Sequence, residues 1–586
     1  MPRDRRERTT DEKKYRGSRA QAGGQTLQSW TVGALPLINS LLERIDLESF
    51  LEKHLPPDDP RLEIPTACGL ALLVRNILLS REPIYGLGEW AARYAPDLLG
   101  LTSDQLEGLN DDRIGRCLDR LFDTEVPALV LDVVRHVIQQ FHVGLDELHN
   151  DSTTVSFYGA YEEAAQEDRR RGRPTLAIRH GYNKDHRPDL KQLLYILTVT
   201  EDGGVPVYFT SASGNVADDT THRETWQLLR QLVGRPDFLY VADCKLASTE
   251  NLQFIHNQGG RFVTVLPRTR REDAQFRGRL VTSPDAIPWQ DVYDVTDEQG
   301  EVVDRLRVCL DSGTSSEGFR LLWFHSTGKA LRDAARRAKA IERASNELVR
   351  LRDRLLSPKT RFHQRASVAE AVEQVLQQCE AERWIDVEID EFEFSDFKQA
   401  RRGRPTNTTQ YVKRVSTRFS LTFQVNVAAI AEDRASDGVF PLITNDLEMT
   451  AEQLLRAYKR QPLIEKRFSQ FKTDFEVAPV YLKSVSRIQS LLCVYFFVLL
   501  VQTLLERELR RALAQSGATS LPLYPEGRSC RAPTTRRVLD VFDTVQRHHL
   551  SGGQGPDTFI TDLTPIQRQI LQLLHGNPSH YGRSSG

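Results

Sequence analysis

The stretch LDELHNDSTTVSFYG, residues 145–159, decides how the rest of the chain is interpreted. This stretch is predicted to be a β-strand that ends in a polar turn. Two further strands are predicted after it, in LKQLLYILTVT (190–200) and VPVYFTSA (205–212), and the turn EDGG separates them. We therefore expect a sheet to begin near residue 145.

Short apolar runs alternate with helical ones as far as residue 267. Helices are predicted in THRETWQLLRQLV (221–233) and STENLQFIHNQ (248–258), and strands in DFLYVADC (237–244) and RFVTVLP (261–267). A strand-rich start followed by strand–helix alternation is typical of a mixed sheet. The predicted fold class is therefore α/β.

Two acidic residues stand at the predicted ends of two of these strands. Asp151 lies in HNDSTT and Asp243 lies in VADCK. Open sheets place their ligands outside the carboxyl ends of the strands. The two carboxylates could therefore converge although they are far apart in the sequence.

A third acid, Glu465, lies on a strongly helical segment, EMTAEQLLRAYKRQPLIEKRFSQFK (448–472). Tyr458, Glu465 and Lys472 are seven residues apart and share one helix face. The carboxylate could bind a metal ion while Tyr458 and Lys472 contact a nearby DNA phosphate. Pro462 removes a backbone hydrogen bond, so a kink or a restart of the helix is expected just before Glu465.

Three converging carboxylates suit phosphodiester chemistry. Two metal ions about 3.5–4 Å apart activate the attacking oxygen and stabilise the leaving one. Hard divalent ions such as magnesium prefer oxygen ligands. The plainer alternative is that these acids are solvated turn or cap residues, since the chain has 80 Asp and Glu residues in all.

The remaining texture of the sequence suggests how the domains are arranged. Residues 35–55, 64–79 and 111–123 are predicted as helices, the last with Asp111 or Asp112 as its N-cap, and a helix-turn-helix among them stays open. PRTRREDAQFRGR (267–279) is expected to be a basic loop. The predicted boundaries are a disordered tail at 1–25, a helical N-terminal domain at 26–140, the core at 141–269, an insertion at 270–440, the second part of the core at 441–510 and a C-terminal extension at 511–586.

Composition excludes several classes of protein. The formal net charge of −2 means that any nucleic-acid surface must come from local clusters of charge. The seven cysteines are scattered, which suits a reducing compartment, and the charged N-terminus is not a secretory signal. The uncharged run from Leu491 to Val501 is shorter than the ~20 residues of a membrane span, so a buried helix is expected. A cytoplasmic protein without a membrane partner is the resulting prediction.

Two basic segments are candidates for DNA contact. RRRGRP (169–174) and RRGRP (401–405) share an RGRP core that resembles the AT-hook, in which extended arginines enter narrow minor grooves. Arg171, Arg173, Arg402 and Arg404 are the candidate residues. The alternative is a solvated loop punctuated by Gly and Pro.

At the three acids the sequence resembles the DDE transposases of bacterial insertion sequences, in the group related to the insertion-sequence-four family. The family signature on its last catalytic helix is Y-x2-R-x3-E-x6-K, which Tyr458, Glu465 and Lys472 match. Gln461 occupies the position of the signature arginine, and Arg460 stands one residue earlier. The blocks HNDSTTVSFYG, YVADCKLAS and LPLYPEGRSCRAPTTRR are also similar to this group, as is the Gly214–Asn215 turn with Asp218.

The resemblance implies a ribonuclease H-like catalytic core interrupted by the insertion domain at 270–440. It implies that Asp151, Asp243 and Glu465 hold two Mg²⁺ ions, which Mn²⁺ could replace, and that Tyr458, Lys472 and Arg460 support the DNA phosphates. The expected partners are double-stranded DNA, as element ends and as target, and further copies of the chain in a dimer or larger complex that associates with the bacterial nucleoid. The alternatives are a nuclease of this fold that cuts without joining, and an inactive DNA-binding descendant of a transposase.

Overall fold

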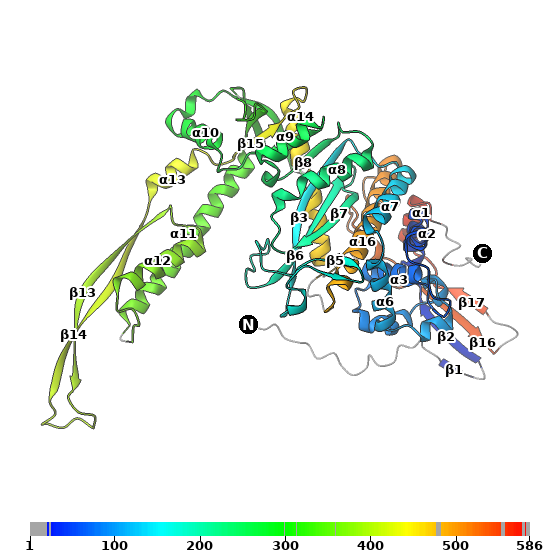
Figure 1. The fold of residues 1–586 in the computed structure, drawn as a ribbon, viewed down its shortest axis with the longest axis horizontal. Helices are drawn as coiled ribbons and strands as arrows, with labels where there is room; N and C mark the ends of the chain where they lie inside the picture. The colour runs from blue at the N-terminus through cyan, green and yellow to red at the C-terminus, as the bar shows by residue number, and fades with distance from the viewer. Residues whose placement is uncertain are drawn as a thin grey trace. The chain divides into compact units, whose positions relative to one another are not determined.

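The computed structural model describes residues 20–22, 25–297, 299–311, 313–357, 359–475, 477, 482–524, 526–552, 557–576 and 581. The chain divides into two compact units, which are treated separately below (Figure 1). The first unit comprises Met1–Val263 and Arg456–Gly586, and the second comprises Thr264–Leu455.

A mixed sheet forms the centre of the first unit. Its middle strand is β3 (Glu147–Phe157), which pairs antiparallel with β6 (Lys191–Thr200), and β6 pairs antiparallel with β7 (Pro206–Ser213). On its other side β3 pairs parallel with β8 (Leu239–Ala242), and β8 pairs parallel with β9 (Arg261–Val265). The predicted strands and the mixed α/β class are therefore confirmed.

Helices cover this sheet. The helices α8 (His222–Val233) and α9 (Thr249–Asn257) lie between the strands in the sequence. Later in the chain, α15 (Pro462–Ser469) packs against β3 and β6, and α16 (Val485–Gln515) packs against β7. Because residues 491–505 of α16 are uncharged and mostly apolar on all sides, this part of the helix is almost entirely buried. Its length and hydropathy would also suit a membrane span, but 89% of its most apolar window is buried within the protein. The interpretation of Leu491–Val501 as part of a buried helix is confirmed.

The helices predicted before residue 140 are present, with two corrections to the expected detail. Residues 20–22 were placed in a disordered tail but form strand β1, whereas residues 1–19 and 23–24 lie outside the described part. Asn110, and not Asp111 or Asp112, caps the helix at 111–122, since its side chain accepts from the backbone N–H of Arg113 at 3.0 Å. The helices are α1 (Leu35–Ile45), α2 (Leu47–His54), α3 (Thr66–Leu79), α4 (Leu87–Ala91), α5 (Ser103–Glu107), α6 (Asp111–Phe122) and α7 (Val126–Phe141).

A second, smaller sheet joins the two ends of the described chain. Its order is β1-β2-β16-β17, and β2 (Gln25–Thr31) pairs antiparallel with β16 (Gln546–Ser551) over six positions. The other elements of this part are β1 (Ala20–Ala22), β17 (Asp557–Ile560), α17 (Thr535–Asp540) and α18 (Pro565–Leu573).

The second unit contains four strands in the order β10-β11-β12-β15 and a projecting arm (Figure 1). The segment predicted as a basic loop is in fact helical, as α10, because Phe276 and Leu280 lie one turn apart and are buried while Asp273 pairs with Arg277 at 2.7 Å. The elements are α10 (Arg271–Thr282), β10 (Trp289–Thr296), β11 (Val302–Cys309), β12 (Arg320–Ser326), α11 (Thr327–Leu356), α12 (Arg365–Cys379), β13 (Ile385–Gln399), β14 (Tyr411–Val425), α13 (Val427–Arg434) and β15 (Val439–Thr444).

Candidate active site

The structure places Asp151 within β3 and Asp243 directly after the end of the neighbouring strand β8, at matching positions in the register. The last residues of the parallel pairing are Asn150 on β3 and Ala242 on β8, so the two aspartates come next in register. Neighbouring strands lie about 4.8 Å apart, so the two carboxylates are close. The sequence interpretation was wrong in one respect, because Asp151 lies within β3 and not at its end. The run that follows Asp151 continues as a strand because it pairs with β6 up to Phe157.

Burial and the neighbouring Lys184 shift the pKa of Asp151 in opposite directions. The pKa of the Asp151 carboxyl is raised to about 6, chiefly by burial and in part by the nearby Asp243, while Lys184 opposes the change. The Lys184 ammonium lies 3.2 Å from Asp151 Oδ1 and 3.2 Å from Asp218 Oδ2, and it donates to the Ser152 carbonyl at 2.7 Å. A half-buried lysine therefore compensates part of the negative charge of this cluster.

Sequence reasoning missed Lys184, because a lysine in a polar loop carries no periodic signal. Its loop is shaped by Asn183, which is buried and whose Oδ1 accepts from the backbone N–H of Asp185 at 2.8 Å. Asp185, which directly follows Lys184, accepts a hydrogen bond from the Lys472 ammonium at 2.5 Å. The loop thus binds the Lys472 ammonium through Asp185 and positions the Lys184 ammonium.

The helix that carries Glu465 begins where the proline predicted a restart. α14 (Ala451–Lys459) ends, and α15 starts with Pro462 as its first residue. Glu465 is exposed on α15, whereas Tyr458 is largely buried. The pKa of Tyr458 is raised to about 12, chiefly by burial and also by the negative charges of Asp243 and Glu465. The negative charges of Asp243 and Glu465 therefore both act on the Tyr458 hydroxyl.

Beyond Ser469 the helix continues as a π-helical turn at Gln470–Asp474. π-turns are rare and occur frequently at functional sites. Lys472 lies in this turn and pairs with Asp185. Its expected contact with DNA stays a prediction.

Arg460 and Gln461 belong to a buried polar network at the start of β3. Arg460 bonds to Glu147 at 2.5 Å and lies 3.3 Å from Glu201. His149 is fully buried between Glu147, at 2.8 Å, and Gln461, at 3.1 Å. His149 is therefore a packed residue of β3. The network also gives Gln461 a structural task, while the phosphate role of Arg460 remains a prediction.

A buried arginine fixes α15 to the sheet. Arg467, two residues after Glu465, is 1% exposed and donates to the carbonyls of Gly203 at 2.7 Å and Gly204 at 3.0 Å. Both glycines have positive φ, +81° and +67°, which permits the tight turn between β6 and β7. The counter-ion of Arg467 is Glu506 of α16, at 3.3 Å and 1% exposed. Glu465 is therefore held on a helix with a charged anchor.

The four arginines of the RGRP segments lie in two hairpins. Arg171 is at the turn between β4 (Asp168–Arg170) and β5 (Arg173–Thr175), and it donates to Asp123 at 2.6 Å. Arg173 pairs with Glu125 at 2.8 Å. Arg402 and Arg404 are exposed in the turn between β13 and β14 of the second unit. The first pair is therefore engaged with acids and the second pair faces solvent.

His222, at the start of α8, is a further buried group near the aspartates. Its Nδ1 lies 3.0 Å from the Tyr240 hydroxyl. Burial lowers the pKa of His222 to about 4, an effect that Lys184 reinforces and that Asp243, Asp218 and Asp219 oppose.

A pH-dependent loss of stability follows from His222. Its folded pKa lies below the unfolded value of 6.5, so the unfolded chain binds a proton that the folded chain excludes. The associated stability is complete above pH 6.5 and is lost as the pH falls toward 4, by about 3 kcal/mol in all. We expect urea unfolding at pH 7 and pH 4 to show this extra loss in the wild type and not in His222→Gln. Parallel pH profiles for the two proteins would contradict the assignment.

The chemistry of the donor set fits hard divalent cations. Asp151, Asp243, Asp218 and Glu465 offer only carboxylate oxygens, and such ligands suit Mg²⁺ or Mn²⁺. In the part of the chain that the structure describes, no three acidic, histidine or cysteine side chains come close enough to hold a single metal ion. The two aspartates are brought together, and Tyr458 is close enough to both Asp243 and Glu465 for each carboxylate to raise its pKa.

Comparison with known proteins gives limited matches. A protein family described as a domain of unknown function, DUF4277, matches residues 27–135, which cover the N-terminal helices. A search of curated proteins gives no match. Among solved structures the chain is similar to piggyBac transposase, from a cryo-EM structure of its synaptic complex with hairpin DNA, with a TM-score of 0.24 and 10% sequence identity. That alignment covers 50% of this chain and 59% of the transposase chain.

Proposed function

We propose that this protein is a DDE transposase that cleaves DNA at the ends of an insertion sequence and joins them to target DNA. The observation that carries the proposal is the register of β3 and β8, which places Asp151 and Asp243 side by side. The match of Tyr458, Glu465 and Lys472 to the signature of insertion-sequence transposases supports it. The strand order β7-β6-β3-β8-β9, in which three antiparallel strands are followed on one side by two strands parallel to β3, agrees with the ribonuclease H-like core that this resemblance implies.

In this proposal Asp151, Asp243 and Glu465 hold two divalent metal ions, Mg²⁺ or Mn²⁺. When bound, the ions polarise the attacking oxygen and stabilise the leaving oxygen of an in-line displacement at phosphorus. The side chains themselves position the ions, and Arg467 positions α15 through its bonds to the β6–β7 turn. Lys184 balances the charge of Asp151 and Asp218.

The other polar groups serve the DNA. Lys472 is partly exposed, with 27% of its side-chain surface accessible, and is tethered to Asp185 by a single ion pair. It can therefore exchange that carboxylate for a backbone phosphate, which is the role the signature implies. Tyr458 lies between the charges of Asp243 and Glu465 and stays protonated, so its hydroxyl can donate to a phosphate oxygen.

The test is cleavage and joining of labelled element ends by the purified full-length chain. The ends are cloned from the DNA that flanks the gene, and reactions contain Mg²⁺, Mn²⁺ or EDTA. We expect nicking in both metals, no nicking in EDTA, and joining of pre-cut ends to a target plasmid. Nicking without joining would favour the nuclease alternative. Footprinting of the ends without cleavage in any metal would favour the inactive DNA-binding alternative.

A further inference from the structure

The second unit carries a long arm built from β13 and β14. The two strands pair antiparallel along 15 positions each, from Ile385 opposite Val425 to Gln399 opposite Tyr411. At about 3.4 Å per residue the ribbon is about 50 Å long. Figure 1 shows it extending beyond the ends of α11 and α12.

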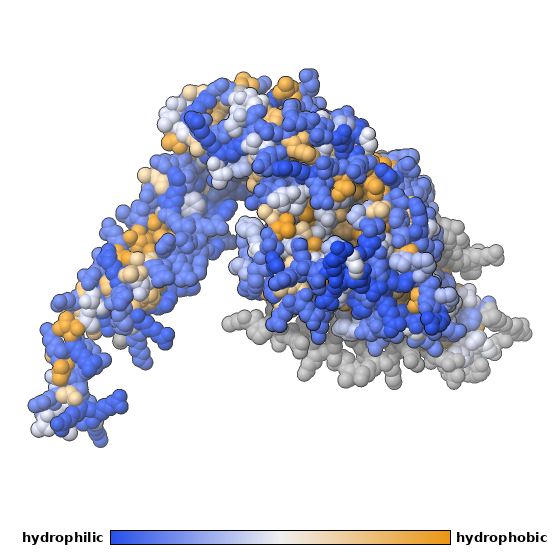
Figure 2. Space-filling view, viewed as in Figure 1, coloured by the Kyte–Doolittle hydropathy of each residue, from blue (hydrophilic) through white to orange (hydrophobic). Residues whose placement is uncertain are grey.

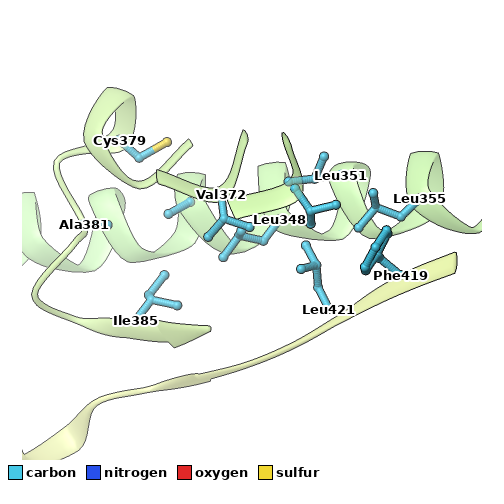
Figure 3. Packing of buried hydrophobic residues seen from close by; sticks show 11 residues of the cluster. Leu348, Leu351, Leu355, Val372, Cys379, Ala381, Ile385, Phe419 and Leu421 are labelled. Carbon is cyan, nitrogen blue, oxygen red and sulfur yellow. The ribbon is translucent and has the colours of Figure 1, made fainter. Parts of the chain in front are cut away.

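The arm is packed only at its base. Leu348, Leu351 and Leu355 of α11 contact Phe419 and Leu421 of β14, and α12 completes this small core (Figure 3). The remaining members of the buried cluster are Ala344, Val368, Val372, Cys379, Ala381 and Ile385. A little further out Arg418 lies over the ring of Phe394 at 3.8 Å. Beyond that contact the ribbon stands free of the unit's core.

The charges of the arm are segregated along its length. Residues 385–396 hold six acidic side chains and no basic one. Residues 397–414, the tip, hold six basic side chains and no acidic one. The basic residues of the tip are Lys398, Arg401, Arg402, Arg404, Lys413 and Arg414.

The cations of the tip are available to a partner. Lys398 lies 3.8 Å from Asp396, and the other five form no ion pair with any described residue. This contrasts with Arg171 and Arg173, whose identical motif is held by acids. The tip also exposes Phe397 and Tyr411, with 66% and 53% of their surface accessible, and Figure 2 shows hydrophobic patches between hydrophilic ones along the arm.

We propose that the tip, residues 397–414, is a binding site for duplex DNA that is separate from the carboxylate cluster of the first unit. A concentration of cations on a chain of net charge −2 is the feature that phosphate binding requires. A two-stranded ribbon has the width that a major groove accepts, and the arginines beside Gly403 can reach the flanking phosphates. Residues 385–396, the acidic shaft of the arm, repel the phosphate backbone of DNA. Contact with DNA is therefore confined to the tip.

DNA binding at the tip is measured in EDTA, so the result does not depend on the proposed catalysis. The probe is a labelled duplex oligonucleotide of arbitrary sequence, and its affinity for the full chain is measured by fluorescence anisotropy over a series of salt concentrations. The variant is the triple substitution Arg401→Ala, Arg402→Ala, Arg404→Ala, in an exposed turn that supports no core. The matched control is Arg336→Ala, Arg350→Ala, Arg383→Ala, which removes three exposed arginines of the same unit that pair with Glu380, Glu347 and Glu432.

We expect the tip variant to bind at least about tenfold more weakly and its salt slope to fall by roughly 2.7, since each lost phosphate contact removes about 0.9. The control is expected to keep the wild-type slope. Equal behaviour of the two triple variants would overturn the proposal. Loss of self-association in the tip variant, measured by sedimentation, with DNA binding unchanged would also overturn it and assign the tip to the acidic shaft of a second copy.

Discussion

Glu465→Gln is expected to lower the rate of DNA strand cleavage by at least about 10³-fold while duplex DNA is still bound. The change removes the negative charge of the proposed metal ligand but keeps the shape of the side chain. Loss of a metal-based stabilisation of several kcal/mol corresponds to this factor, because each 1.36 kcal/mol changes the rate tenfold. Glu465 is exposed on α15 and contributes no buried packing, so the fold is expected to be unaffected. Single-turnover nicking of labelled element ends measures the effect.

The matched control for this experiment is Glu224→Gln, which neutralises an exposed glutamate on α8. It should nick at the wild-type rate. If Glu465→Gln also nicks at that rate, Glu465 is not a metal ligand and the assignment of the third acid fails. Asp151→Asn and Asp243→Asn extend the test to the aspartates that the β3–β8 register places together.

Glu506→Gln is expected to destabilise the first unit by about 3–5 kcal/mol, the range found when one member of a buried ion pair is removed. The carboxylate is 1% exposed and accepts from Gln470 at 3.0 Å and from the backbone of Thr535 at 3.2 Å. Its loss would leave the guanidinium of Arg467 buried without a counter-ion. Equilibrium urea unfolding measures the change in free energy.

Glu250→Gln is the control for the buried pair. It breaks the surface pair with Arg223, whose partners are 80% and 45% exposed, and such pairs contribute at most about 1 kcal/mol. A loss of similar size in both variants would contradict the role assigned to Glu506. Because Arg467 anchors the helix of Glu465, Glu506→Gln should also lower the cleavage rate under conditions where the protein remains folded.

Local patterns in the sequence were sufficient to predict most elements of the first unit. The runs that became β6 and β7 are short, apolar and rich in β-branched or aromatic residues, the run that became α8 has helical periodicity, and each formed as expected. α10 was not predicted, because its many arginines gave the segment the composition of a loop and only Phe276 and Leu280 mark its buried face. The turn predicted after Asp151 failed because Ser, Thr and Thr suit both turns and strands, and only pairing with β6 decides between them.

The candidate site was predictable where it depended on strand and helix positions and not where it depended on loops. Asp151 and Asp243 could be proposed together because parallel strands end at a common edge. The contact of Lys184 with both Asp151 and Asp218 joins a loop to two other segments, and no spacing in the sequence indicates it. The same holds for Arg467, whose partners lie about 40 and 260 residues away.

The small sheet that pairs β2 with β16 has a consequence for synthesis of the protein. Its two strands are separated by about 500 residues, so β2 leaves the ribosome long before its partner exists. At 5–20 residues per second the delay is roughly 25–100 s. During that time the N-terminal helices carry a strand with an unpaired edge, which is a site for wrong association. A chaperone that shields this edge co-translationally would therefore raise the yield of folded protein more than one that acts after release.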